Sequence, residues 1–145
     1  MEKEVLIDIK GNQYSKADDT GETQETSLEE SLRGKLYDKN GKLYVTYEER
    51  SDESEEPDKV MLKINGSSFE MTRKGLLISN FSFKKGEVHK SDYITPFGTF
   101  LMCVTTKECN VYIFEDKINL HAVYDMEIND EFAGENEISI RITVI

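Results

Sequence analysis

The 145 residues include two histidines, His89 and His121, and two cysteines, Cys103 and Cys109, the side chains that are examined first for metal binding or thiol chemistry. His121 and Asp125 fall on one face of a predicted strand, but four extended residues separate them by about 13 Å, too far to share an ion. Cys103 lies in an apolar run, whereas a reactive cysteine needs a neighbouring base and an electropositive setting. We therefore predict no catalytic residue, no metal and no cofactor, although missing motifs do not exclude an enzyme.

Local motifs do not point to an activity either. The chain has no Gly-rich phosphate loop, no Cys-x-x-Cys pair and no nucleophile elbow. The acidic run 51–58 offers oxygen ligands, but it lacks the alternating acidic spacing and central glycine of a helix-loop-helix calcium loop. A run of like charges is usually a solvated loop, which is the reading we favour here.

Arg73 is a charged residue on a predicted strand whose neighbouring residues on the same face are apolar. Arg73 has the strand parity of Phe69 and Met71, so it can point into the packed face only if its charge is paired. Asp125 or the carboxylate of a ligand could pair it; the alternative is that Arg73 reaches solvent at the rim. The residues that we predict to bind a ligand are Tyr47, Arg73, Tyr93, Tyr124 and Asp125.

The segment from Tyr93 to Ile128 shows the clearest strand pattern. Apolar and polar residues alternate through 118–128, which predicts a long strand with one packed and one wet face. A tight connection is predicted around Thr106 and Lys107. Cys103 and Cys109 would face each other across a three-residue loop or lie on opposite faces with a two-residue loop, and we expect free thiols.

Similar alternating runs cover most of the chain. Segment 28–36 fits a helix or a strand, and we favour the strand because the hairpin signal Asn40-Gly41 follows it. Segments 16–26 and 51–58 read as acidic loops. About 8–10 strands with mostly short turns predict an all-β fold, a single antiparallel up-and-down β-barrel over 1–145 rather than a Greek-key sandwich.

Composition narrows the choice of partners. With 18 basic and 29 acidic residues the net charge is −11, which disfavours nucleic acid and anionic membranes. A chain of 145 residues can bury a sufficient core as one domain. The first residues lack the apolar core of a signal peptide, so we predict a cytoplasmic protein.

Several short motifs occur together in order. They are Gly34-Lys35-Leu36-Tyr37, the run 43–49, Thr72-Arg73-Lys74-Gly75, the run 93–98 and Tyr124-Asp125-Met126. In order and spacing the chain resembles the YwiB-like family of uncharacterised bacterial proteins. The resemblance implies a lipocalin-like (calycin) β-barrel, and it implies no particular activity or ligand.

Two functions remain open from the sequence. The first is a non-enzymatic module that binds a small, partly apolar ligand in the barrel lumen. The alternative is an interaction or scaffold protein with a filled barrel that acts through an outer face or as a homodimer. An enzyme would require a convergent set of titratable groups at the barrel mouth.

Overall fold

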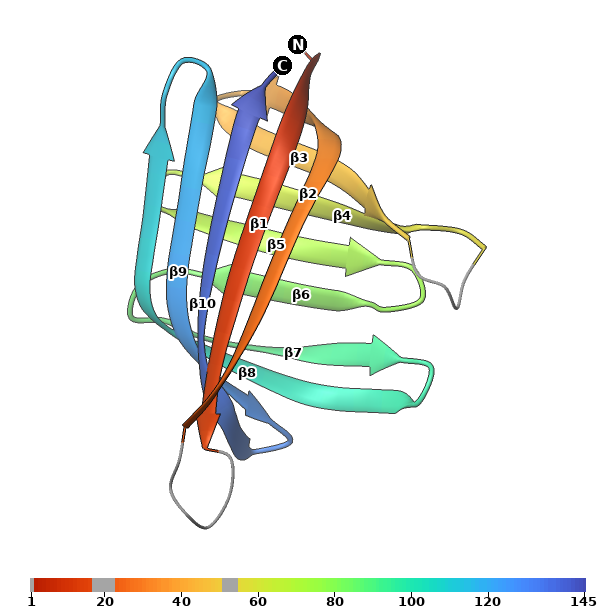
Figure 1. Cartoon of the computed structure of the whole chain (residues 1–145), viewed down its shortest axis with the longest axis vertical. Helices are drawn as coiled ribbons and strands as arrows, with labels where there is room; N and C mark the ends of the chain where they lie inside the picture. Colours follow the sequence, from red (N-terminus) through yellow and green to blue (C-terminus); the bar gives the residue numbers. More distant parts are fainter. Residues whose placement is uncertain (1, 17–22, 51–54) are drawn as a thin grey trace.

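The computed structural model describes residues 2–16, 23–50 and 55–145, and it is all-β (Figure 1). Alternation of apolar and polar side chains is the signal that predicted strands, and the described residues form ten of them. They are β1 (Glu2–Lys16), β2 (Thr23–Lys39), β3 (Lys42–Glu49), β4 (Asp58–Asn65), β5 (Ser68–Lys74), β6 (Ser79–Phe83), β7 (Val88–Thr95), β8 (Gly98–Ile113), β9 (Lys117–Ile128) and β10 (Glu131–Val144). The described part contains no helix of the length and apolarity that crossing a membrane requires.

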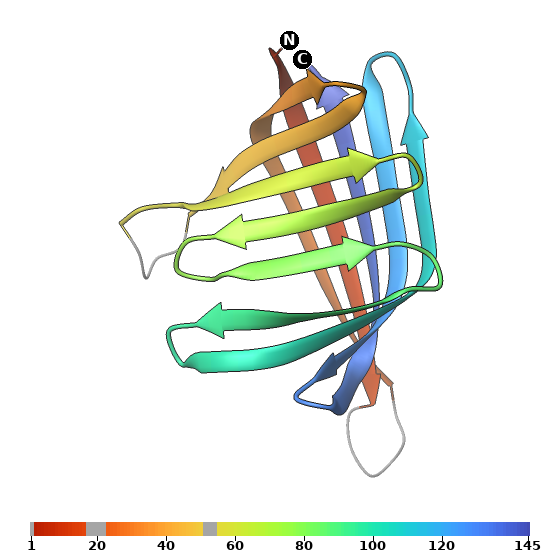
Figure 2. The same cartoon turned by 180° about the vertical axis from the view of Figure 1, so that it is seen from behind.

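The strands form one antiparallel sheet in the order β6-β5-β4-β3-β2-β1-β10-β9-β8-β7. Strands that follow one another in the chain are therefore paired in the sheet, except β6 and β7 at its two ends. Strand β1 also pairs with β10, from Val5 opposite Val144 to Tyr14 opposite Glu135. Both ends of the chain lie together at one end of the barrel (Figures 1 and 2). This topology confirms the predicted up-and-down barrel.

The barrel is nearly closed, with a seam between β6 and β7. There the two strands meet at one isolated bridge, in which Ile78 and Ile94 exchange two backbone hydrogen bonds of 2.9 Å each. The strands β6 and β7 run side by side without a continuous ladder (Figure 2). The seam thus leaves two adjacent strand edges largely unpaired with each other.

The core fills the middle of the barrel. Along β4 every second residue is buried, as expected for a strand with one packed face. The rings of Phe69 and Phe83 lie 5.0 Å apart between centroids, and Tyr124 packs on Phe83 at 4.9 Å. Aromatic packing of this kind contributes about 0.5–1.5 kcal/mol per pair beyond the area buried.

The predicted turn around Thr106 and Lys107 is wrong, because β8 runs through it as one bent strand. A β-bulge shifts the register against β9 between Thr106 and Glu108. The turn after β6 supports it: Gly86 donates to the Thr106 carbonyl at 2.9 Å, and Thr106 donates to Glu87 at 3.0 Å.

Because β8 is continuous, the distance between the two cysteines is fixed by the strand. Cys103 and Cys109 lie on one strand, six residues apart, which is about 20 Å and far beyond disulfide reach. Both thiols are free, as predicted, although neither of the two loop geometries holds.

Two predicted loops are shorter than expected. Strand β1 continues to Lys16 and β2 begins at Thr23, so only residues 17–22 of the first loop lie outside the described residues. Residues 51–54 of the second loop also lie outside them, and Asp58 is buried at the start of β4. The strand 28–36, favoured over a helix, is confirmed within β2.

Candidate binding site at the fork between β2 and β3

Strands β2 and β3 form a fork. They pair from Lys39 opposite Lys42 to Gly34 opposite Tyr47, and beyond that pair β2 stays with β1 while β3 leaves it. In Figure 1, β2 follows β1 down the barrel and β3 turns aside towards β4. We call the point beyond Gly34 and Tyr47, where the strands part, the fork.

A glycine makes the fork possible. A Cβ at Gly34 would collide with the carbonyl oxygen of Thr46 and lie 2.7 Å from Cδ1 of Ile7 and 3.2 Å from Cβ of Tyr47. Real Cβ atoms do not come so close to carbonyl oxygens. The absence of a side chain therefore lets β2 touch both neighbours at the last residue before it separates from β3.

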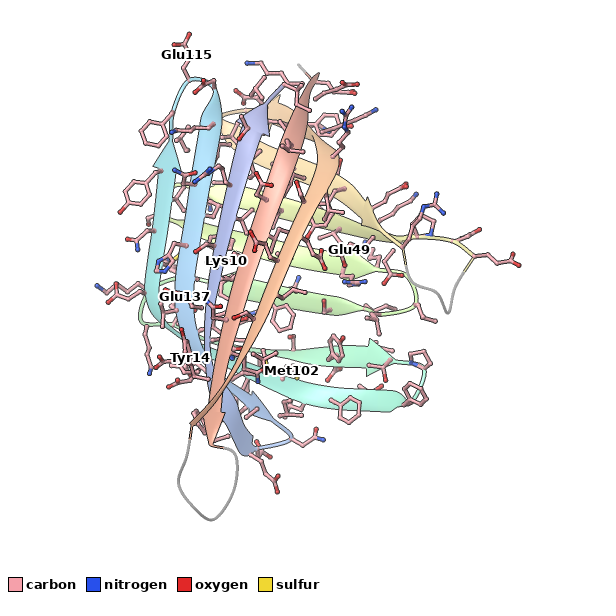
Figure 3. The ribbon with its side chains drawn as sticks, viewed as in Figure 1. Lys10, Tyr14, Glu49, Met102, Glu115 and Glu137 are labelled. Carbon is pink, nitrogen blue, oxygen red and sulfur yellow. The ribbon has the colours of Figure 1, made fainter. Side chains whose placement is uncertain are left out.

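On the inner side of the fork, an arginine lies between two carboxylates. Glu49 and Asp58 are directly opposite in the register of β3 and β4, an arrangement that is unfavourable for two like charges. Nε of Arg73 donates to Oδ2 of Asp58 at 2.8 Å, and its Nη1 bonds to Oε2 of Glu49. Arg73 therefore joins the two carboxylates, and Figure 3 marks Glu49 at the end of β3.

Asp58 is the most buried member of this cluster, with 2% of its side chain exposed. Its carboxylate accepts from the backbone amides of Leu76 at 2.7 Å and Leu77 at 3.4 Å, as well as from Arg73. Burial alone would raise the pKa of Asp58, but the hydrogen bonds from Arg73 and Leu76 hold that pKa below its usual value. Asp58 thus ties the β5–β6 turn to Arg73.

Glu30, from the part of β2 beyond the fork, completes the inner cluster. A hydrogen bond with Glu49, burial and the charge of Glu49 raise the pKa of Glu30 to about 7, while Arg73 opposes the shift. Burial first, then Glu49 and Glu30, also raise the pKa of Tyr47. The inner cluster is defined as Glu30, Tyr47, Glu49, Asp58 and Arg73. Within it, the pKa of Glu30 is the one shifted towards neutral pH.

The outer side of the fork opens into a groove of about 1020 Å³. Leu32, Tyr47 and Val60 form an apolar floor, and Met61 adds a half-exposed thioether. Its remaining lining residues are mostly basic or hydroxyl-bearing: Arg33, Lys35, Arg50, Lys59, Lys74, Thr46 and Thr72, with Gly34 and Glu48. The groove combines an apolar surface with polar edges, as small-molecule sites usually do.

Two of the five predicted ligand-binding residues come together at the fork. Tyr47 is opposite Val60, and Val60 is opposite Arg73, so the three lie in one row across β3, β4 and β5. The predicted inward parity of Arg73 agrees with its position in the inner cluster, and 23% of its side chain is exposed. Its charge is already paired within the chain.

Asp125, one of the alternatives considered as a partner for Arg73, does not pair with it. Asp125 lies on the outer face of β9 and pairs with Lys107 at 3.1 Å, and Lys107 also reaches Glu135 at 2.5 Å. Tyr124 is the next residue on the strand, so its side chain points the other way, into the core against Phe83. Burial raises the pKa of Tyr124 to about 12.

Tyr93 is half-buried on β7, across the seam from the fork, where it is opposite Phe100. His121 was read as a residue of a solvated face, and it is half-buried: its Nε2 lies 2.8 Å from Oε2 of Glu137 and its Nδ1 lies 3.3 Å from Asn110. Within residues 2–16, 23–50 and 55–145, no group of three or more His, Cys, Asp or Glu side chains could hold a metal ion.

Sequence reasoning missed three members of the inner cluster, which are Glu30, Glu49 and Asp58. A signal for each was present, because each continues the parity of an apolar strand face: Glu30 lies between Leu28 and Leu32, and Glu49 follows Tyr47 by two residues. A carboxylate on the same strand face as core residues indicates a buried charge, and a buried charge needs a partner.

The fold and the fork together define a lipocalin-like, nearly closed ten-stranded barrel with a lateral groove. Residues 7–140 match the family DUF1934, described as a domain of unknown function, and the chain belongs to that family. The crystal structure of the ywiB protein from Bacillus subtilis is similar, with a TM-score of 0.78 and 22% identity over 99% of this chain and 93% of that chain. The predicted YwiB-like relationship is confirmed. No curated protein matches the chain.

Proposed function

We propose that the protein is a non-enzymatic module that binds one small, partly apolar ligand in the groove at the fork. The observation that carries the proposal is the apolar floor of Leu32, Tyr47 and Val60 within a hollow of about 1020 Å³. Drug-sized ligands occupy pockets of about 300–1,000 Å³ with apolar walls and a few polar groups. The packed rings in the middle of the barrel favour this lateral position over the lumen.

The inner cluster adjoins the groove through Tyr47 and supports the proposal. Tyr47 belongs to both, because it is a lining residue of the groove and its environment includes Glu49, Glu30 and Arg73. The paired charges hold the ends of β3, β4 and β5 in fixed positions. Strand ends that are already fixed before binding lower the entropic cost of binding at the neighbouring groove.

Native mass spectrometry of the freshly purified protein, followed by the neutral dye N-phenyl-1-naphthylamine, tests the proposal. We expect a retained mass that denaturation removes, or saturable enhancement of dye fluorescence. Met61→Gln in the groove should weaken dye binding. Val88→Gln is the control, because Val88 is also exposed (58%) but lies on β7, outside the groove. Equal dye binding by both variants would contradict a site at the fork.

A second function, contact with another protein or another copy of the chain, is favoured by an apolar patch beside the seam. Ile78, Ile94 and Leu101 are 41%, 40% and 36% exposed, and Phe97 at the β7–β8 turn is 87% exposed. Sedimentation of the wild type and of Ile94→Lys distinguishes the two. A dimer lost on substitution would support this second function, and a monomer in both would count against a homodimer.

A further inference from the structure

We infer that the ligand of the groove carries an anionic head: a small organic anion with an apolar body and a carboxylate, sulfonate or phosphate group. This inference rests on the proposed function and adds the charge of the ligand to it. Its starting observation is the sign of the groove. Five basic side chains line it and one acidic side chain, Glu48, whereas the whole chain has a net charge of −11.

The register explains how the cations gather. Lys59 lies opposite Glu48 on one side and opposite Lys74 on the other, so this row of the outer face carries two cations and one anion. Arg33 and Lys35 flank Gly34 on the opposite side of the groove. Arg50 follows the last residue of β3. Cations therefore border the groove on both sides of the fork.

Most of these charges are not neutralised by the protein. Lys35 forms an ion pair with Glu2 at 3.1 Å, and both side chains are about half exposed. In the described ranges of the chain, no ion pair engages the other four cations, which are Arg33, Arg50, Lys59 and Lys74. Like charges around one hollow repel one another, and a bound anion relieves that repulsion.

The floor decides which anions fit. An inorganic anion would use the cations but leave the half-buried side chain of Leu32 in contact with water, while a neutral hydrocarbon would use only the floor. An organic anion uses both features, with the apolar body on the floor and the head among the cations. Arg side chains offer two-pronged hydrogen bonds to carboxylate or phosphate, and Lys offers a point charge.

Two dyes with the same aromatic body test the inference. 8-Anilinonaphthalene-1-sulfonate carries a sulfonate, and N-phenyl-1-naphthylamine lacks it. We expect the sulfonate dye to bind the wild type more tightly. In the triple variant Arg50→Glu/Lys59→Glu/Lys74→Glu its Kd should rise on the order of tenfold, with little change for the neutral dye. Lys90→Glu, an exposed lysine on β7 outside the groove, is the control and should leave both dyes unchanged.

Salt dependence provides a test on the unaltered protein. Raising NaCl from about 0.05 M to about 0.5 M should weaken binding of the sulfonate dye and leave the neutral dye unaffected, because salt screens exposed charges. The single variant Lys59→Glu, checked by circular dichroism, repeats the test if the triple variant does not fold. Displacement of the sulfonate dye by octanoate or by octyl phosphate then distinguishes the two natural sources of the head group.

The outcomes distinguish the inference that the ligand is anionic from the proposed function, which is ligand binding in the groove. If both dyes bind equally, with no effect of salt or charge reversal but a loss in Met61→Gln, the groove binds apolar ligands and the anionic inference is overturned. If neither dye binds, both are overturned. A sulfonate dye that binds equally well to the triple variant also overturns the inference.

Discussion

The carboxylate of Asp58 occupies the space into which a side chain at Gly75 would project. A Cβ at Gly75 would lie 2.6 Å from Cγ of Asp58 and overlap one of its oxygens. The glycine of the Thr72-Arg73-Lys74-Gly75 motif is therefore paired with a residue 17 positions earlier in the chain. This relationship joins the β5–β6 turn to the start of β4 and makes both residues testable together.

A double-mutant cycle at Asp58 and Gly75 should be strongly non-additive. Asp58→Ala leaves Arg73 with Glu49 alone and should lower the free energy of unfolding by about 3–5 kcal/mol. Gly75→Ala should cost about 1–3 kcal/mol in the wild type. It should cost less in the Asp58→Ala background, because the clash with the carboxylate is gone and only the approach of 2.9 Å to the Cα of residue 58 and the positive φ of 156° remain. Urea denaturation measures all four proteins. Additive costs would show that the two residues do not compete for space.

Gly34→Ala should destabilise the fork by about 1–3 kcal/mol, because the new Cβ collides with the backbone of Thr46. Gly11→Ala on β1 is the matched control, since a Cβ there meets only the carbonyl oxygen of Glu137 at 3.9 Å. Replacing that strand glycine should be neutral or slightly stabilising. Equal losses in the two variants, measured by thermal unfolding, would contradict the close approach at the fork.

Glu30 should make stability fall between acidic and neutral pH. Its pKa of about 7 in the folded protein exceeds the usual 4.5. The contribution of the protonated carboxyl is therefore complete below pH 4.5 and is lost as the pH rises through 7. Glu30→Gln should match the wild type near pH 4.5 and exceed it above pH 7, by about 1 kcal/mol or less given the screening by solvent.

Urea denaturation at several pH values measures this difference. Glu29→Gln is the control, because the neighbouring side chain points to the opposite face of β2 and is exposed. Parallel pH curves for the wild type and Glu30→Gln would rule out the hydrogen bond between Glu30 and Glu49.

Thr106→Val should stabilise the barrel by up to about 1 kcal/mol. The side chain is 1% exposed, and its Oγ1 has no hydrogen-bond partner among the residues that the structure describes. A buried hydroxyl without a partner is costly, and valine has nearly the same shape. Thr105→Val, at the half-buried neighbour, is the control. A loss of stability in Thr106→Val alone would indicate that the hydroxyl is satisfied in solution.

Much of the fold was predictable because strand alternation is a local property. The long run 118–128 and the hairpin at Asn40-Gly41 were predicted from adjacent residues alone, and both are present. The bulge in β8 was not predictable in the same way. Thr106 stays in the strand because its backbone bonds to Gly86 and Glu87, and that contact joins segments about twenty residues apart in the chain.

The candidate site was predictable only in part. The inward parity of Arg73 follows from its own strand, but its partners come from other strands. Asp58 was hidden because it ends an acidic run, although it also begins the core-facing series that continues at Val60. The position of a charged residue along its strand predicts the face of the sheet on which it lies. Its partner depends on how the other strands pack against that face, which the local sequence does not show.

The two edges of the sheet, β6 and β7, are consecutive in the chain, whereas the two ends of the chain, β1 and β10, pair in the middle of the sheet. The strand order is therefore a circular permutation of a simple meander. A circular permutant that begins at Val88, with Ile145 linked to the first residue and the new C-terminus after Phe83, would arrange its strands in one unbroken meander. In that permutant the pairing of β10 with β1 becomes a local hairpin, and the contact order falls. The natural order instead pairs strands from the two ends of the sequence, so we expect closure of β1 on β10 to slow folding relative to the permutant.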